Sequence, residues 1–308
     1  METDERIQTA AKFLLQSPPG EINDVLNDVR NIISDDEALQ AGAATALREY
    51  NLTQFITAEV PGHQHQCIVS EAALVPKQSS TEEGAEGEAE QEQENDDIDR
   101  FWDPRSRTSF RFDHLNLEAS DPAPIDPDPE SEPFRNALET STLNYLEAHY
   151  HSGVSSVFPT QGNTSRYIIQ IVANKYNPSN FWSGRWRSEY TIDLAEKTLT
   201  GKILVNVHYY EQGNVQLSTT HNISLALPPT ITPNPAPASA NKVLALIESE
   251  ETKYQSSLNE AYSEMGEKTF KGLRRALPMT RSKLDWDKVL GYKLGAELSA
   301  NKGGFAAS

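Results

Sequence analysis

The sequence has almost no cysteine and no long apolar run. Its 308 residues contain one cysteine, Cys67, so no disulfide can form within the chain, which is typical of a reducing compartment. No stretch approaches the roughly 18 uninterrupted apolar residues of a membrane span. The first ten residues, METDERIQTA, lack an apolar segment of signal-peptide length. We therefore expect a cytoplasmic protein.

Sequence motifs of catalysis are also missing. No GxxxxGK[ST] loop, no GxGxxG opening a helix and no GxSxG elbow occurs. Carboxylates are plentiful but lie in solvated runs, where they do no acid–base work. The sequence therefore offers no catalytic residue, and we expect neither an enzyme nor a cofactor. Nucleic acid is not an expected partner, because the net charge of −18 opposes a polyanion.

Apolar residues are scarce for a compact globule, at 37% of the chain with a mean hydropathy of −0.59. Part of this deficit lies in residues 78–99, which hold ten acids and no base. Such a run cannot bury enough apolar surface to offset the entropy of ordering it. We interpret 78–99 as a disordered acidic insertion.

Positive charge is rare overall but gathers near the carboxyl end. Residues 268–293 hold eight basic and two acidic residues, a local charge of +6. A cationic segment on an acidic protein indicates a local binding surface. Pro278 ends the helix that runs into this segment. Beyond it, one face of a helix is apolar through Trp286, Val289, Leu290, Leu294 and Leu298.

Two interpretations of this tail remain open from the residues alone. It is either a last helix folded onto its own domain, or a tethered helix that lays its apolar face into a groove on a partner. The break at Pro278 and the ending NKGGFAAS, which has no means of attachment, favour the second.

The remaining chain predicts an α+β fold. Apolar periodicity indicates three short antiparallel helices within residues 5–50 and another helix at 134–149. Alternation indicates five strands, joined by short turns into an antiparallel meander: 154–158, 166–173, 185–194, 201–210 and 214–227. The predicted units are a helical stalk at 1–50, extended segments at 51–133, a helix, sheet and long helix at 134–277, and the tail at 278–308.

The long helix is predicted at residues 241–277 and would cover one face of the sheet. At about 1.5 Å per residue it is roughly 55 Å long, too long for the sheet of one small domain. A second sheet from a partner chain would give it a surface to lie on.

The string HQHQC places His63, His65 and Cys67 at alternate positions. Alternate residues of a strand can share one side, as metal ligands must. No fourth ligand is evident, however, and the spacing matches no zinc pattern. We expect no metal here.

Five long strings resemble the alpha subunit of F-actin capping protein. They are NFWSGRWRSEY at 180–190, VHYYEQGNVQL at 207–217, the segment TFKGLRRALPMTRSKLDWDKVLGYKLG at 269–295, and the strings at 10–30 and 101–122. The resemblance spans nearly the whole chain in order. The acidic insertion at 78–99 departs from the family pattern, and the GGFAAS end runs past the usual terminus.

The resemblance implies an obligate heterodimer with a beta subunit of like fold and a sheet shared between the two. It implies Ca²⁺-independent capping of the barbed, fast-growing end of actin filaments without severing, and a place at cytoskeletal actin patches. Lys271, Arg275 and Lys283 would be the main basic contacts to actin. The other actin-binding residues that it implies are Arg274, Arg281, Trp286, Lys288, Leu290 and Leu294.

A different function is left open by the same tail. Its lysines flank a Trp and Leu face, as in helices that lie on membrane surfaces, so an adaptor binding acidic phosphoinositides is the alternative. Such lipids could also be further partners of a capping protein.

Overall fold

A computed structural model describes residues 3–76, 98–211 and 215–265 of the chain. It divides into two compact units, residues 1–250 and 251–308. The first unit holds all the described strands and every described helix except the second part of the last one.

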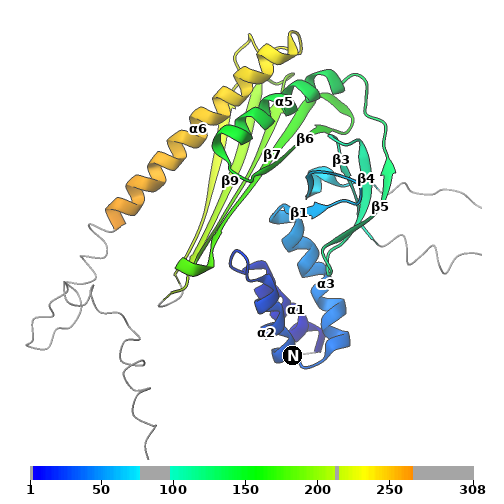
Figure 1. The fold of residues 1–308 in the computed structure, drawn as a ribbon, viewed down its shortest axis with the longest axis vertical. Coiled ribbons are helices and arrows are strands. Elements are labelled where there is room, and N and C mark those ends of the chain that lie inside the picture. Colours follow the sequence, from blue (N-terminus) through cyan, green and yellow to red (C-terminus); the bar gives the residue numbers. More distant parts are fainter. Residues whose placement is uncertain (1–2, 77–97, 212–214, 266–308) are drawn as a thin grey trace, which may run out of the picture. The chain divides into compact units, whose positions relative to one another are not determined.

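Three helices open the chain, as the sequence predicted: α1 (Thr3–Leu15), α2 (Ile22–Ile33) and α3 (Asp36–Thr53) (Figure 1). Gly42 lets α1 and α3 approach closely, because a Cβ on it would lie 2.1 Å from Ile7 Cγ2. Burial of one apolar face per helix holds the bundle together. The buried residues are Ala10, Ala11, Leu14, Val29, Leu39, Ala43, Ala46 and Leu47.

Two small sheets follow, of which the sequence predicted only extended segments. β1 (Ile56–Glu59) pairs with β2 (Gln66–Val69), and a 3₁₀ turn, η1, covers Glu71–Ala73. β3 (Arg100–Asp103), β4 (Thr108–Asp113) and β5 (Glu118–Pro124) form an antiparallel sheet of three strands. Residues 121–124, within the predicted extended segments, belong to β5.

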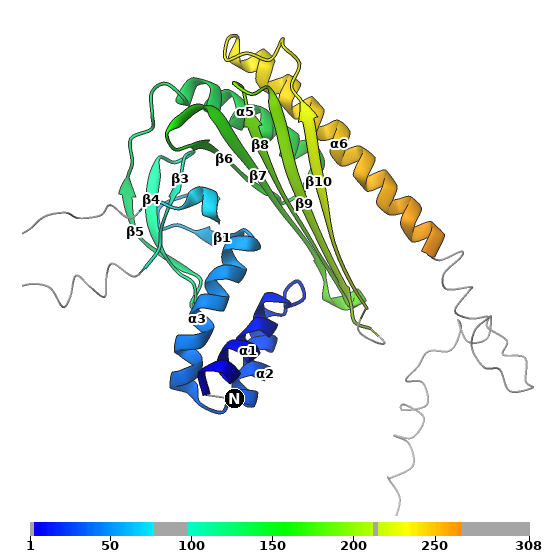
Figure 2. The ribbon, with the colours of Figure 1, turned by 180° about the vertical axis from the view of Figure 1, so that it is seen from behind.

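The third sheet is the predicted five-stranded antiparallel meander, in the order β10-β9-β8-β7-β6 (Figure 2). Its strands are β6 (Val154–Thr160), β7 (Asn163–Asn177), β8 (Trp182–Asp193), β9 (Thr198–Tyr209) and β10 (Val215–Ala226), with a 3₁₀ turn, η2, at Pro178–Asn180. β7, β8 and β9 pair along 12 consecutive residues without a shift in register.

Helix α5 (Glu132–His149) covers one face of this sheet over β6 and β7. The Phe134 ring meets the Tyr167 ring at 5.1 Å between centroids. On the same face, Tyr190 of β8 lies against Gly201 of β9, where a Cβ would come within 2.5 Å of the Tyr190 ring. The sequence had assigned the cover to the last helix alone, so this role of α5 corrects the prediction.

Helix α6 (Ala236–Glu264) begins five residues earlier than predicted. Its first part lies beside α5, where the Ser141 hydroxyl donates to Asn241 Oδ1 (2.7 Å) and His149 lies 3.2 Å from Glu248. The predicted continuation to residue 277 lies outside the described residues. No helix in the part of the chain that the structure describes is long and apolar enough to cross a membrane.

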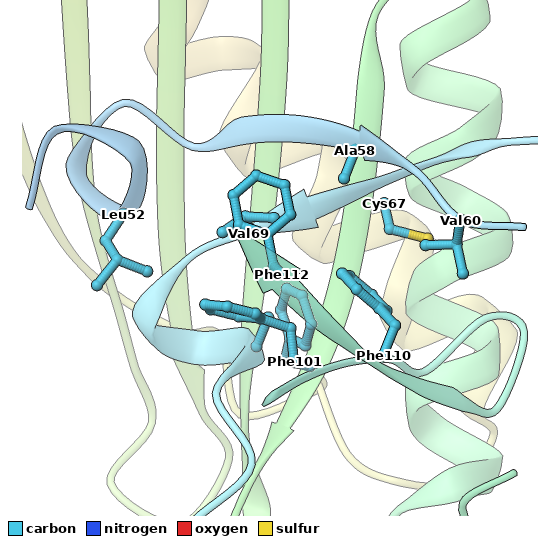
Figure 3. Packing of buried hydrophobic residues seen from close by; sticks show 10 residues of the cluster. Leu52, Ala58, Val60, Cys67, Val69, Phe101, Phe110 and Phe112 are labelled. Carbon is cyan, nitrogen blue, oxygen red and sulfur yellow. The ribbon is translucent and has the colours of Figure 1, made fainter. Parts of the chain in front are cut away.

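Aromatic rings fill the core between the two small sheets and β6 (Figure 3). Phe101 is fully buried and meets Phe110 and Phe112 at 6.2 and 6.1 Å between ring centroids. Phe110 and Phe112 of β4 are buried and Arg111 between them is half-buried, so this strand directs alternate side chains into the core.

The burial of Phe101 allows a first test of this core. We expect Phe101→Ala to lower the free energy of unfolding by about 3–5 kcal/mol, because it leaves a cavity among packed rings. Phe13→Ala is the control, since Phe13 is 54% exposed, and should change stability by about 0.5 kcal/mol or less. Urea unfolding measures both. Equal losses in the two variants would contradict this description of the core.

Candidate partner-binding interface

The outer edge of β10 is open. Among the described strands, β10 pairs with β9 alone, through all 12 of its residues and without a bulge (Figure 2). An edge strand of this kind presents a row of backbone donors and acceptors that a further strand can use.

The register shows which residues point outward. Leu227 N–H donates to the Lys197 carbonyl (2.8 Å), one step beyond the Ala226–Thr198 pair. Antiparallel pairs alternate between bonded and non-bonded, so the odd-numbered residues of β10 direct their backbone groups at β9. The even-numbered residues direct theirs away from it. Those whose side chains are also exposed include Ser218, Thr220, Asn222, Ser224 and Ala226.

The composition of β10 does not protect this edge. Natural edge strands avoid unwanted pairing with lysines, prolines, bulges or short length. Residues 215–226, VQLSTTHNISLA, contain no proline, lysine, arginine, aspartate or glutamate. Val215 is 64% exposed at one end of the strand. A long, regular and uncharged edge is therefore a surface suited to another strand.

The sheet is held to the helical bundle by two arginines from the 180–190 string. Arg185 donates to the Tyr50 hydroxyl (2.9 Å) and to Gln54 Oε1 (2.7 Å). Arg187 donates to the carbonyls of Gln54, Ala173 (3.1 Å) and Trp186 (2.8 Å). These contacts fix the end of α3 against β8, so the bundle and the open edge belong to one unit.

Arg187 is 3% exposed. Burial, and secondarily the neighbouring Arg185, lower the pKa of Arg187 to about 9. Keeping a guanidinium charged at such a position costs free energy, which its carbonyl acceptors offset. Sequence reasoning had used these arginines only as part of a family string, and nothing in their residue type indicated burial.

A second polar contact joins α3 to the end of β4. Asn51 Nδ2 donates to the His114 carbonyl (3.0 Å), and His114 Nε2 lies 3.3 Å from Asp99 Oδ2. Burial lowers the pKa of His114 below its ordinary value, although Asp99 opposes this change. Arg48 and Asp113 are the other charged groups that act on it.

The lowered pKa gives an expected pH dependence. As pH falls through about 6.5, the unfolded chain binds a proton at His114 that the folded chain does not yet bind. Stability should therefore decrease from pH 7 to 5, and His114→Gln should make this decrease smaller. His151→Gln is the control, because His151 is exposed. An unchanged pH slope for His114→Gln in urea unfolding would contradict this assignment.

The residues predicted to bind actin all lie outside the described residues. They are Lys271, Arg274, Arg275, Arg281, Lys283, Trp286, Lys288, Leu290 and Leu294. The structure therefore places the open strand edge, and it does not place the tail. Sequence reasoning did not single out β10 as an edge, although the lack of charge and proline at 215–226 was a usable signal.

Comparison with known proteins identifies the family of this chain. The sequence model described as "F-actin capping protein alpha subunit" matches residues 10–297. The chain belongs to this family. The resemblance found in the sequence is confirmed, and so is the prediction that the protein is not an enzyme, because this is a family of structural, actin-capping proteins.

Members of the F-actin capping protein alpha subunit family resemble the chain over nearly its full length. The F-actin-capping protein subunit alpha of Emericella nidulans is 35% identical over 298 residues, covering 96% of this chain and 98% of the relative. That of Caenorhabditis elegans is 34% identical over 310 residues, covering 96% and 97%. That of Dictyostelium discoideum is 32% identical over 302 residues, covering 96% and 98%.

A solved structure supports the fold of this family member. The homodimeric actin capping protein alpha subunit from Plasmodium berghei superimposes with a TM-score of 0.63, covering 86% of this chain and 94% of that one. At 19% identity this likeness concerns the fold. It confirms the predicted α+β architecture.

Proposed function

We propose that the chain is the alpha subunit of a heterodimeric actin capping protein. The dimer binds the barbed ends of actin filaments without needing Ca²⁺, and blocks subunit exchange there without severing. Family membership supports actin capping and association with the cytoskeleton. We propose actin patches as its place within the cytoskeleton. The observation that most directly supports a heterodimer is the edge of β10, which is uncharged and has no bulge.

The beta subunit is proposed to add its own sheet along β10. The outward row at Ser218, Thr220 and Asn222 would exchange backbone hydrogen bonds with an edge strand of the partner. A continuous sheet would then extend across both chains. The dimer also brings a second actin-binding attachment close to the first, and two tethered sites gain on the order of 10²–10⁴ in avidity.

The basic segment at 268–293, which runs into the tail, is proposed to contact actin, with Lys271, Arg275 and Lys283 as the main cations. Charge on a partner-binding segment mainly sets the association rate and the register of binding. The neighbouring Trp286, Leu290 and Leu294 would then bury their apolar face in the complex.

Purification of the native protein under non-denaturing conditions tests the dimer. We expect one equivalent of a second polypeptide, with the sequence of a capping protein beta subunit, to accompany the chain through gel filtration. Recovery of two copies of this chain and no second polypeptide would contradict the heterodimer. Recovery of a monomer would contradict the role given to β10.

Reversing three charges in the basic segment at 268–293 tests the role of its cations. We expect Lys271→Glu, Arg275→Glu and Lys283→Glu together to slow association with filament ends by at least about tenfold at low salt, because steering is lost. The dissociation rate should change less. Lys202→Glu, on the sheet, is the control and should change neither rate. An effect confined to dissociation would contradict the steering argument.

A further inference from the structure

Three side chains with metal-binding atoms meet between β2 and β3. They are His65, just before β2, Cys67 within β2, and Asp103 at the end of β3. Their ligand atoms all lie within 4.8 Å of one another. Cys67 and Asp103 are each 2% exposed, whereas the His65 side chain is 24% exposed. Two of the three side chains are therefore buried, and the third is partly exposed to solvent.

Hydrogen bonds already connect the Asp103 carboxylate to its neighbours. His65 Nε2 lies 2.8 Å from Asp103 Oδ2, which also accepts from the backbone N–H (2.9 Å) and the hydroxyl (2.6 Å) of Ser106. Burial, followed by the nearby Asp103 carboxylate, raises the pKa of the Cys67 thiol.

We propose that this cluster is a zinc site, with His65 Nε2, Cys67 Sγ and Asp103 as protein ligands and a water in the fourth position. Zinc bonds of about 2.0–2.3 Å place neighbouring ligand atoms about 3.5 Å apart in a tetrahedron. Ligand atoms within 4.8 Å of one another reach this arrangement by small side-chain rotations. A mixed nitrogen, sulfur and oxygen set favours Zn²⁺ over Mg²⁺ or Ca²⁺, which prefer oxygen alone.

Charge also suits the burial of this site. Binding takes the proton from the Cys67 thiol and releases it to solvent, so a thiolate and a carboxylate neutralise Zn²⁺. His65 binds through Nε2 with its proton on Nδ1, and its hydrogen bond to Asp103 is replaced by two bonds to the metal. The complex is neutral, which lowers the cost of keeping it out of water.

The metal would connect two small sheets whose strands do not pair with each other. β1 and β2 form one sheet and β3 to β5 another, joined through the apolar core of Figure 3. A zinc ion bound by Cys67 and Asp103 would fix the position of one sheet relative to the other. The sequence predicted no metal at HQHQC because no fourth ligand was evident and the spacing matched no zinc pattern. Asp103 lies 38 residues after His65, so the string itself did not reveal it.

Cobalt substitution and zinc titration of the full-length, assembled protein test the site. We expect one Co²⁺ per chain, with the near-ultraviolet charge-transfer band of a cobalt–thiolate bond, displaced by one equivalent of Zn²⁺. Zinc at 100 times its Kd should raise the equilibrium ratio of folded to unfolded protein about 100-fold and raise the Tm by several degrees. Affinity should increase with pH, because binding releases the thiol proton.

Variants assign the ligands. Cys67→Ala should abolish the thiolate band, and His65→Ala should weaken zinc binding by at least about 10-fold. His63→Ala is the matched control, because His63 lies two residues before His65. It should change neither the thiolate band nor the affinity for zinc. Absence of stoichiometric binding by the unmodified protein would overturn the proposal. Binding that survives Cys67→Ala unchanged, or that is lost equally in His63→Ala, would overturn this ligand set.

Discussion

Removal of residues 278–308 is expected to lower the affinity for filament barbed ends by two to four orders of magnitude while leaving the dimer intact. The shortened chain keeps all the described strands and helices, so β10 and its proposed partner strand are unchanged. The tail supplies one of two tethered attachments, and loss of one removes an avidity gain on the order of 10²–10⁴. Filament elongation from seeds, followed against the concentration of the dimer, measures the change.

The expected size follows from the tail's own energetics. Its five apolar side chains would contribute about 7–15 kcal/mol gross on burial. Ordering the residues that carry them costs roughly 1–2 kcal/mol each. The helix alone therefore binds weakly, and it acts by adding to an attachment that the dimer already has. A control chain ending after residue 301 should cap normally. Unchanged elongation kinetics with the chain ending at Leu277 would show that the tail is not a contact.

Prolines on the outward side of β10 are expected to disrupt the heterodimer. Ser218→Pro with Thr220→Pro removes two N–H groups that point away from β9, so the pairing within the chain is kept. Each lost bond between chains leaves a carbonyl of the partner unpaired, at a cost of about 1–3 kcal/mol, so the two changes together cost about 2–6 kcal/mol. The dimer should weaken by on the order of 10²–10⁴-fold. Analytical ultracentrifugation of the co-expressed pair measures this change.

Ser218→Ala with Thr220→Ala provides the matched control. These changes remove the same hydroxyls and keep both backbone N–H groups, so dimerisation should stay within about threefold of the unmodified protein. Circular dichroism of the proline variant should still show its sheet, because prolines are tolerated on edge strands. A proline variant that dimerises as tightly as its alanine control would show that the partner does not pair along β10.

The sequence predicted the five-stranded meander well where apolar and polar residues alternate. Ile203, Val205 and Val207 share one face of β9, and that strand was found within three residues of the prediction. β7 is longer than predicted, because Asn174, Lys175 and Tyr176 break the apolar alternation. Their strand conformation comes from pairing with residues 183–185 of β8, which no local pattern reveals.

The small sheets were harder to predict for physical reasons. β5 contains Pro122 and Pro124, which argue against a strand, yet it lies at a sheet edge where proline is tolerated. Arg185 and Arg187 belong to a residue type that is normally exposed, and their burial depends on carbonyls and hydroxyls from α3 and β7. The contact of Asp103 with His65 joins residues far apart in the sequence.

For the proposed interface, too, local sequence patterns were less informative than contacts between residues far apart in the sequence. The shared sheet was implied by the family resemblance and suggested by the length of the predicted long helix. The structure adds a specific edge with assigned outward residues, including Ser218 and Thr220. The actin-binding residues remain a prediction from the tail's sequence, because Lys271 through Leu294 lie outside the described residues.

Growth of single actin filaments, imaged with both ends identified, tests the central claim most directly. With the purified alpha and beta pair present and Ca²⁺ chelated, barbed ends should stop growing while pointed ends continue, and the number of filaments should not increase. Continued growth of barbed ends at saturating concentrations of the pair would contradict the account, and so would a requirement for Ca²⁺ or the appearance of new ends by severing.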